Sequence, residues 1–580
     1  MTRTVTARMI AGLLIIFAST SLHGQAAGFW DIPAPAEPFA WPVTDRAVID
    51  QLVALRDAMS DEERVAQLLM VSWPSEAPSA EIMRWIRERN IGGVKVFGWN
   101  GENLPVLSDT IALMQRESLA TANGVPLFTA TDQEGGWVRH VKGGTSITPG
   151  NMAIGASGLP YDAMMSARYI GLELRALGIN MNFAPTVDVY INPDAHVIGP
   201  RAFSADPVES GVLGIAYYRG LQQTGVMATA KHFPGHGNAG GDSHGMLPVI
   251  EDDLDTIWER DLVPFRMLIR EGVPAILIGH LSFPRVTGDD SPASISRVFK
   301  EEILRRRMNF DGVVITDDLY KRGALDYGIA EGWDFPELVK QAIEAGNDIV
   351  MLSRTPAFDG DIWRRLISAY REEPNFRRRV DESVLRILTV KYAYLRPEER
   401  VTLSPDRQEL ADHLRTEEST RFFLDQAGRS VTVVSDDAIP LQPAPGERIL
   451  LAGKDPDFFR EGRIAYPGSD EFRFIGESFY QSDGADRATF ARLVNAYDTV
   501  IFLLSDPDSL QVLQAGRDGS ARIIVYSTLT PIYLDELPWI RTAIAVYGWG
   551  QESFAAGYAV LRGDIEATGA LPIRLNGGDP

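Results

Sequence analysis

The chain has 580 residues, too many for one ordinary domain, so two or three domains are expected. Its formal net charge of −22 leaves no basic surface for a phosphate backbone and argues against nucleic-acid binding. It contains no cysteine, which excludes disulfides, thiolate nucleophiles and iron–sulfur clusters.

The N-terminus has the pattern of a secretory signal peptide over residues 1–26. Arg3 and Arg8 precede an apolar run at 9–18, and small residues suited to cleavage follow. The run is shorter than the ~20 apolar residues that a membrane span needs, which favours cleavage over an uncleaved anchor. We therefore predict a secreted or periplasmic mature protein without stable membrane insertion.

Eight short apolar runs alternate with amphipathic segments between residues 41 and 395. The runs lie at 65–73, 91–98, 126–132, 179–188, 226–235, 275–283, 310–319 and 347–353. Segments between them, such as 79–90 and 298–308, have the three- and four-residue apolar spacing of helices. This alternation predicts an α/β fold, a (β/α)₈ TIM barrel over 41–395. A doubly wound open sheet is the alternative.

Residues 396–414 are charged, contain proline and lack strand character, so a linker is expected there. Five further apolar runs follow, separated by polar or helical stretches. They lie at 429–435, 448–454, 498–505, 521–527 and 541–548. The pattern predicts a smaller C-terminal α/β domain over 415–580, in the form of a three-layer sandwich.

Polar residues gather at the expected carboxyl ends of the barrel strands, where the active sites of this fold lie. They are Asp132, Arg201, Lys231, His232, Thr316, Asp317 and Asp318. Such a convergence from several strands predicts an active site. For Asp188 and His280, which end or lie in two further strands, we expect structural roles.

The segment 230–245, AKHFPGHGNAGGDSHG, contains three of the eight histidines. His232 and His236 are four residues apart, as in helical zinc sites, but proline and glycine between them argue against a helix. We expect His236 to shape the turn, and we predict a site without a metal or other cofactor. The alternative is a metal site formed by His232, His236, His244 and Asp242.

Asp242 and His244 are suited to acid/base chemistry. They are two residues apart, so in an extended loop both side chains point the same way. A carboxylate bonded to one ring nitrogen fixes the tautomer and raises the basicity of the imidazole, which can then donate and recover a proton. Glycines around the pair would let the loop close over a substrate. With a carboxylate after the seventh strand as nucleophile, these groups suit double displacement at a glycosidic bond.

The motifs DQEGG, NFAPTVD, KHFPGHG, DSH and GVVITDDL occur in this order. On these motifs the chain resembles glycoside hydrolase family 3, most closely its β-N-acetylglucosaminidase branch in the two-domain form. The resemblance implies Asp317 as nucleophile, His244 as acid/base and Asp242 as its partner. It also implies that the sugar is held by Asp132, Arg201, Lys231 and His232. The β-glucosidase branch takes its acid/base glutamate from the second domain and lacks the Asp-Ser-His signal.

The chain departs from the family pattern at three places. The family arginine, eight residues after the aspartate of DQEGG, is replaced by His140, and Arg139 stands one position earlier. Arg139 is therefore expected to reach the sugar through an altered turn, or else the contact is lost. Pro200 stands where acidic residues are common and is expected to stiffen its loop. Asn238 and Ala239 replace the usual Asp-Thr after PGHG.

The leading hypothesis is a retaining exo-β-N-acetylglucosaminidase that acts on β-linked GlcNAc from peptidoglycan or chitin fragments. Its partner is then a small carbohydrate substrate, with no nucleic acid. The alternatives are a β-N-acetylglucosaminide phosphorylase, a β-glucosidase-type family 3 hydrolase, a non-catalytic carbohydrate-binding relative and a metal hydrolase. The phosphorylase is considered because a histidine that has donated its proton repels phosphate less than a carboxylate would.

Overall fold

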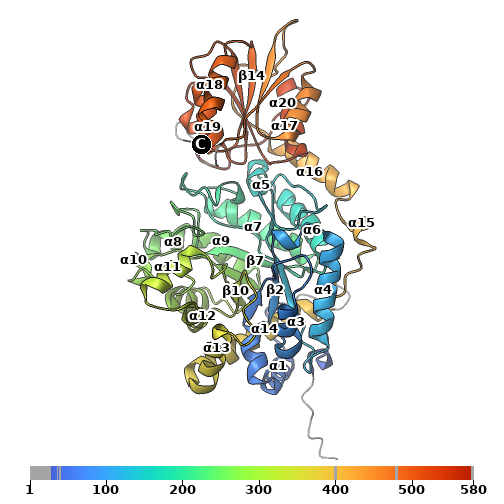
Figure 1. Cartoon of the computed structure of the whole chain (residues 1–580), viewed down its shortest axis with the longest axis vertical. Helices are drawn as coiled ribbons and strands as arrows, with labels where there is room; N and C mark the ends of the chain where they lie inside the picture. Colours follow the sequence, from blue (N-terminus) through green and yellow to red (C-terminus); the bar gives the residue numbers. More distant parts are fainter. Residues whose placement is uncertain (1–27, 36, 38–40, 398–401, 477–480, 576–580) are drawn as a thin grey trace, which may run out of the picture.

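The computed structural model describes residues 28–35, 37, 41–397, 402–476 and 481–575. The predicted signal peptide, residues 1–26, lies outside these residues. Within the described part, no helix combines the length and apolar character needed to cross a bilayer. The chain forms a barrel and a smaller domain that sits on one end of it (Figure 1).

The barrel has eight parallel strands in the order β10-β1-β2-β3-β6-β7-β8-β9. They are β1 (Leu69–Val71), β2 (Gly93–Val96), β3 (Phe128–Thr131), β6 (Met181–Asn182), β7 (Met227–Phe233), β8 (Ala275–Ile278), β9 (Val313–Thr316) and β10 (Val350–Leu352). Each falls within one predicted run. A parallel bridge between Ile315 and Ile349 brings the two ends of the sheet together. The predicted barrel is confirmed, and the open-sheet alternative is wrong.

Helices surround the strands and cover their outer faces, except α5, which lies at the boundary with the smaller domain (Figure 1). They are α1 (Arg46–Ala58), α2 (Asp61–Gln67), α3 (Ala80–Arg89), α4 (Leu104–Leu119), α5 (Asn151–Ser157), α6 (Pro160–Ala176), α7 (Pro207–Gln222), α8 (Leu254–Glu259), α9 (Leu262–Arg270), α10 (Pro284–Thr287), the π-helix η4 (Val298–Arg307), α11 (Arg322–Ala330), α12 (Phe335–Glu344), α13 (Asp361–Glu372) and α14 (Pro374–Leu395). All eight strands are buried on both faces, which explains why they read as continuous apolar runs rather than alternating patterns.

Helix α3 shows how local sequence signals set these elements. The Ser79 hydroxyl accepts a hydrogen bond from the amide of Ile82 at the N-terminus, and Asn90 ends the helix in the left-handed conformation. Serine and asparagine favour these two positions because they satisfy or tolerate the unpaired backbone there. The buried face carries Ile82, Trp85 and Ile86, at the spacing from which the helix was predicted.

The smaller domain is built on a six-stranded sheet in the order β11-β16-β15-β14-β12-β13. The strands are β11 (Thr432–Ser435), β12 (Ile449–Gly453), β13 (Asp470–Arg473), β14 (Thr499–Leu504), β15 (Arg522–Thr528) and β16 (Thr542–Tyr547). All neighbours are parallel except β11 and β16. Sequence reasoning missed β13 because this edge strand, with the sequence DEFR, is charged, as edge strands often are.

Helices cover both faces of this sheet, which gives the predicted three layers. Figure 1 shows α18 (Gly484–Leu493) and α19 (Pro507–Ala515) on one side, with α17 (Pro456–Ala465) and α20 (Gln551–Arg562) on the other. Helix α16 (Glu417–Ser430) leads into the domain, and α15 (Leu410–His413) lies in the predicted linker 396–414.

Besides the barrel's own core, one apolar cluster contains residues of both parts of the molecule. In it, Met152 of α5 and Ile198 and Ala202 of a barrel loop are buried together with Ile532 and Tyr533 of the smaller domain. Backbone hydrogen bonds cross the same boundary, from Ala205 to the carbonyl of Pro572 (2.9 Å) and from Ala570 to the carbonyl of Ala156 (2.9 Å). The smaller domain therefore packs directly on the loop at 190–205.

Candidate active site

The carboxyl ends of the barrel strands open into a pocket of about 440 Å³, within the range of roughly 300–1,000 Å³ typical of small-molecule sites. The residues predicted from the sequence that line it are Asp132, Arg201, Lys231, His232, His244 and Asp317. Other polar and aromatic side chains in its lining are Phe97, Trp99, His140, His236, Ser243, Asp318, Lys321 and Ser353. Six of the predicted residues, distant in sequence, thus meet around one pocket, whereas Asp242 and Arg139 are not part of its lining.

Asp317 directly follows β9 and is held as a buried carboxylate. Its Oδ1 accepts a hydrogen bond from the backbone N–H of Asp318 (2.7 Å), and its Oδ2 accepts one from Lys321 Nζ (2.6 Å). Burial alone would raise the pKa of Asp317, but the positive charge of Lys321 outweighs it and holds the pKa far below its usual value. Asp317 is therefore ionised throughout the neutral range.

The neighbouring Asp318 has a different environment. Its carboxylate accepts hydrogen bonds from the backbone N–H groups of Tyr320 (3.3 Å) and Ser353 (2.9 Å). Both bonds end at Oδ1 and tie Asp318 to the chain after β9 and after β10. Asp318 is thus held by backbone amides, whereas Asp317 is also held by a side-chain cation.

His244 and Asp242 form the pair that their spacing predicted. His244 Nδ1 lies 2.6 Å from Asp242 Oδ1, which also accepts a hydrogen bond from the backbone N–H of His244 (2.9 Å). Burial opposes ionisation of Asp242, but the bonds from His244 outweigh it and lower the pKa of the carboxyl to about 2. Because the carboxylate can only accept, Nδ1 carries the proton of this bond and Nε2 is left for proton transfer.

Lys231 and Asp132 form the centre of a buried charge network. Lys231 Nζ lies 2.5 Å from Asp132 Oδ1 and also contacts Glu134 Oε1. Lys95 Nζ reaches the other oxygen of Asp132 at 2.8 Å. Although burial favours the neutral acid, these two lysines hold the pKa of Asp132 well below its usual value. A carboxylate fixed in this way presents a preorganised acceptor to a hydroxyl-bearing ligand.

Arg201 and His232 continue this network from neighbouring elements. Arg201 forms a bidentate pair with Glu134, with Nε–Oε2 and Nη2–Oε1 distances of 2.9 and 2.7 Å. Its Nη2 also lies 3.1 Å from His232 Nε2. His232 Nδ1 in turn lies 2.8 Å from Asp188 Oδ2. Since Nδ1 donates to the carboxylate, Nε2 is the acceptor towards Arg201.

Asp188 and His280 have the structural roles expected from the sequence. Asp188 accepts hydrogen bonds from the backbone N–H groups of His232 (3.2 Å) and His236 (2.7 Å), which fixes the turn after β7. His280 is fully buried, and its ring nitrogens contact the Ser294 hydroxyl (2.7 Å) and a backbone carbonyl (2.9 Å).

The structure places Arg139 outside the pocket lining, which favours the second of the two expectations for this residue, a lost contact. Arg139 lies in the hairpin of β4 (Gln133–Gly135) and β5 (Val138–Arg139). Its Nη1 donates to two backbone carbonyls, at 3.2 and 3.0 Å, and the side chain does not line the pocket. Successive residues of a strand point to opposite sides, so the next residue, His140, faces the pocket instead. Burial, with the nearby charge of Lys95, lowers the pKa of His140 to about 4, so its ring is neutral at pH 7.

The geometry does not favour the metal alternative. His232 already has partners at both ring nitrogens, and the His236 ring lies edge-on to it at a centroid distance of 5.8 Å. Among the described residues, no three or more His, Asp or Glu side chains are grouped so that they could hold a metal ion.

Sequence reasoning missed two buried charges behind the pocket and one aromatic pair in its lining. Glu134, within the DQEGG motif, and Lys95, a lone charge in an apolar run, are both buried and pair with the lining residues Arg201, Lys231 and Asp132. Trp99 stacks on Phe97 with ring centroids 4.6 Å apart and an interplanar angle of 7°. Flat aromatic surfaces of this kind suit the apolar face of a sugar ring.

We expect the ionisation of Glu134 to make the free energy of unfolding depend on pH. Burial opposes its ionisation, but Arg201 and Lys231 lower its pKa from 4.5 to about 2. A depressed carboxyl pKa contributes stability above the unfolded-state value, and this contribution is lost as the pH falls from 4.5 towards 2. It amounts to about 3 kcal/mol.

Urea unfolding of wild type and Glu134→Gln at pH 7 and below pH 4 would measure this effect. The variant should be destabilised at pH 7 by roughly 3–5 kcal/mol, because it leaves buried cations underpaired, and should lose less on acidification. Glu271→Gln, at an exposed pair with Arg219 (2.6 Å), is the control and should change little. An unchanged acid dependence in Glu134→Gln would contradict the assignment.

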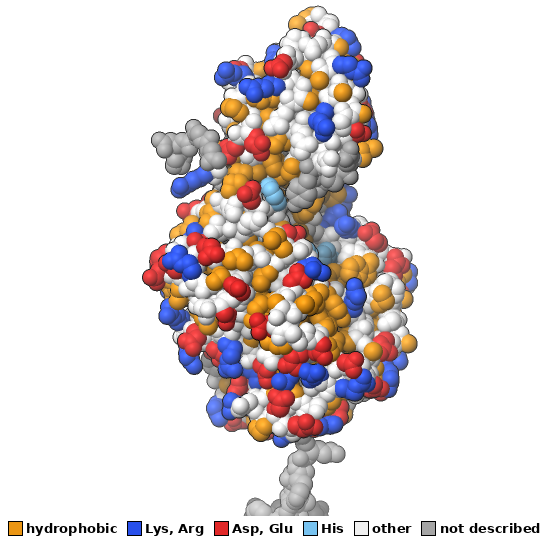
Figure 2. Space-filling view, turned by 60° about the vertical axis from the view of Figure 1, so that its left-hand side comes forward, with side chains coloured by type: hydrophobic (Ala, Val, Ile, Leu, Met, Phe, Trp, Pro, Cys, Tyr) orange, Lys and Arg blue, Asp and Glu red, His pale blue; other side chains and the backbone are white. Residues whose placement is uncertain are grey.

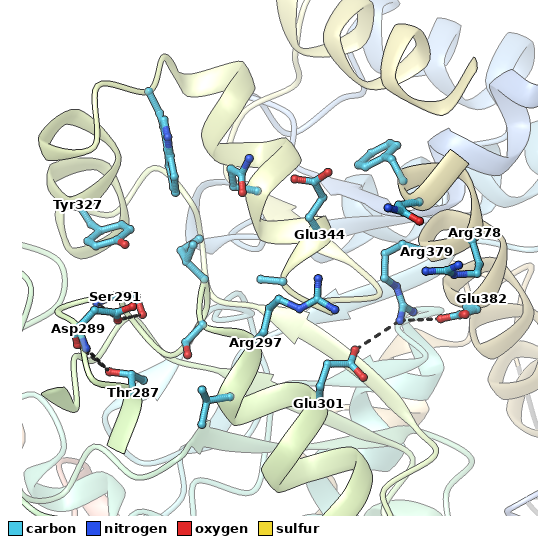
Figure 3. Close-up of a pocket in the computed structure, with 18 residues that line it drawn as sticks. Thr287, Asp289, Ser291, Arg297, Glu301, Tyr327, Glu344, Arg378, Arg379 and Glu382 are labelled. Carbon is cyan, nitrogen blue, oxygen red and sulfur yellow. Dashed lines mark hydrogen bonds and ion pairs between the residues drawn. The ribbon is translucent and has the colours of Figure 1, made fainter. Parts of the chain in front are cut away.

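A second, larger pocket of about 850 Å³ lies on the outer side of the barrel between η4, α12 and α14 (Figure 3). It contains none of the predicted site residues. Its Arg379 is already paired, with Glu382 at 3.0 Å and Glu301 at 3.7 Å.

On the face shown in Figure 2, Lys and Arg side chains are interspersed with Asp and Glu among the described residues, so that face offers no broad basic area to a nucleic acid.

Fold and site together define a (β/α)₈-barrel protein with an acid/base pocket at the carboxyl ends of its strands. Residues 60–390 match the model for the glycosyl hydrolase family 3 N-terminal domain. This match covers more than half of the chain, which therefore belongs to glycosyl hydrolase family 3.

Curated relatives include beta-hexosaminidase A of Pseudoalteromonas piscicida, 36% identical over 290 residues that cover 47% of this chain and 47% of that protein. The beta-hexosaminidase of Hydrogenovibrio crunogenus is 38% identical over 239 residues, covering 40% and 64%. Beta-hexosaminidase LpqI of Mycobacterium tuberculosis is 32% identical over 366 residues, covering 62% and 89%. The aligned part thus spans about half the length of the first of these relatives.

Among solved structures, a glycoside hydrolase family 3 beta-N-acetylglucosaminidase from Paenibacillus sp. is similar with a TM-score of 0.79 and 29% identity. The match covers 89% of this chain and 99% of that one. A structure of the beta-glucoside phosphorylase BglX is similar with a TM-score of 0.77 at 22% identity, covering 92% of this chain and 97% of that one; this second likeness concerns the fold alone.

Proposed function

We propose that the protein is a retaining exo-β-N-acetylglucosaminidase that is exported from the cytoplasm and removes terminal β-linked GlcNAc from peptidoglycan or chitin fragments. The observation that carries the proposal is that Asp317 and His244, whose ring is bonded to Asp242, both line one pocket of about 440 Å³. The relatives named beta-hexosaminidase support the choice of sugar, and the signal-peptide pattern at residues 1–26 supports export.

In the first step, Asp317 attacks the anomeric carbon and the bond to the leaving oxygen breaks. His244 donates the Nε2 proton to that oxygen, and the sugar becomes an ester of Asp317. In the second step, neutral His244 takes a proton from water as its oxygen attacks the same carbon. The ester bond breaks, and its electron pair returns to the Asp317 carboxylate. Two inversions give net retention of configuration.

The charge network beside the nucleophile positions the sugar in this proposal. Asp132, Lys231, Arg201 and His232 offer acceptors and donors to the ring substituents. Their mutual hydrogen bonds exist before a ligand arrives, so less reorganisation is needed on binding. Glu134 has no direct contact in this scheme and serves as the buried counter-ion of Arg201 and Lys231.

A set of aryl β-glycosides that differ only at the sugar tests the proposal. We expect turnover of the GlcNAc compound well above that of the glucose compound, with the β-anomer of free GlcNAc seen first by NMR. The same assay with inorganic phosphate should give the same product at the same rate. Initial α-anomer would refute retention, GlcNAc-1-phosphate would establish phosphorolysis instead, and loss of activity with a chelator would favour a metal hydrolase.

A further inference from the structure

Lys321 lies at the centre of the proposed chemistry although it falls outside the motifs that carry the family resemblance. It immediately precedes α11, and its side chain, 16% exposed, lines the pocket. Its Nζ donates a hydrogen bond to Asp317 Oδ2 at 2.6 Å. The residue thus touches one of the two oxygens that would form and release the ester.

The start of α11 is also tied to the loop of the acid/base pair. The backbone N–H of Gly323 donates to the carbonyl of Ser243 at 3.1 Å, and Ser243 lies between the two members of the pair. The Lys321 charge also helps, after the bonds from His244, to keep the pKa of Asp242 low. Lys321 therefore contacts the proposed nucleophile directly, and the helix that follows it is bonded to the loop of the acid/base pair.

The charge on Asp317 changes during the reaction, while that on Lys321 does not. In the free enzyme the two form a largely buried ion pair. Once Asp317 is an ester it carries no charge, and the Lys321 ammonium loses its partner in a poorly solvated place, which is costly. In the second step, negative charge develops again on Asp317 as the bond to the sugar breaks, and the pair re-forms.

Lys321 thus has opposite effects on the two steps. Pairing with the ammonium stabilises the free carboxylate and makes it a weaker nucleophile in the first step. The same pairing stabilises the departing carboxylate in the second step, when water attacks and His244 takes its proton. A fixed cation aimed at a developing charge is an effective form of transition-state stabilisation.

We propose that Lys321 is a catalytic residue of the second step, where it stabilises the Asp317 carboxylate as it leaves the glycosyl-enzyme. The proposal rests on the proposed function, and it adds a fourth residue to the Asp317, His244 and Asp242 set. It predicts that removal of the ammonium shifts the slow step towards hydrolysis of the ester.

The test compares the full-length wild type with Lys321→Met and Lys321→Arg on 2,4-dinitrophenyl β-GlcNAc, whose leaving group departs without a proton. For Lys321→Met we expect a burst of the phenolate, then a steady-state kcat lower by about 10²- to 10³-fold. Intact-mass analysis should show the sugar ester accumulating on Asp317. Lys321→Arg keeps the charge and should recover a large part of the rate.

Lys340→Met is the matched control, because Lys340 and Glu344 form an i,i+4 ion pair at 3.1 Å on α12, outside the pocket. It should keep the wild-type kcat and show no burst. A wild-type kcat in Lys321→Met would overturn the proposal, as would a fall in kcat without a burst or adduct. No recovery by Lys321→Arg would also count against a role of the charge.

The proposed function and the role of Lys321 fail in different ways in this experiment. If the wild type hydrolyses the substrate through an Asp317 adduct and Lys321→Met has the same kcat without a burst, only the role of Lys321 is refuted. If the wild type does not hydrolyse any aryl β-GlcNAc, both proposals are refuted.

Discussion

Asp317→Ala is expected to abolish nearly all turnover of an aryl β-GlcNAc, with kcat lower on the order of 10⁴-fold or more. The alanine variant cannot form the ester. The two other described carboxylates that line the pocket are held by other groups, Asp132 by Lys95 and Lys231 and Asp318 by the backbone of Tyr320 and Ser353. Steady-state kinetics of the purified variant measure the loss.

Two comparisons sharpen this result. Azide enters the space left by the alanine side chain and should restore part of the bond cleavage, with an α-glycosyl azide as product, since only one inversion then takes place. Asp318→Asn should lose less activity than Asp317→Ala. Full activity of Asp317→Ala, or a larger loss in Asp318→Asn, would refute Asp317 as the nucleophile.

His244→Ala should be the second most damaging change, with kcat for a natural glycoside lower by about 10²- to 10⁴-fold. The loss should depend on the leaving group, because a sugar alkoxide needs the proton from His244 whereas 2,4-dinitrophenolate does not. First-step rates on the dinitrophenyl glycoside should therefore change little. The exposed His413→Ala variant is the control, and equal losses for both leaving groups would contradict the acid role.

The barrel could be predicted because its strands are buried on both faces and must be apolar along their length. The run at 275–283 contains β8 for this reason, although the strand itself ends at Ile278. The same criterion failed for β13, whose edge position permits charged side chains. Strands could thus be predicted where both faces are buried, and they were missed where one edge faces solvent and charged residues are permitted.

The site was predictable only in part. Residues in contiguous motifs, such as Lys231 and His232, could be assigned to the pocket because they lie at the carboxyl end of β7, although both face it only through an irregularity of the strand between Ala230 and Phe233. Which of Arg139 and His140 faces the pocket depends on how β4 and β5 pair in their hairpin, and residue spacing in the sequence does not predict this pairing. Lys321 meets Asp317 across the turn that follows β9, so its role emerges from geometry rather than from any motif.

The apolar cluster shared by the 190–205 loop and the smaller domain has a consequence for the pocket. Arg201 belongs to the same loop as Ile198 and Ala202, which are buried against Ile532 and Tyr533. A barrel synthesised without the C-terminal part would leave this apolar surface in water and the loop at 190–205 without its packing partners. We therefore expect the position of Arg201 to depend on the presence of the smaller domain, so that truncation of the chain would disturb the pocket from a distance.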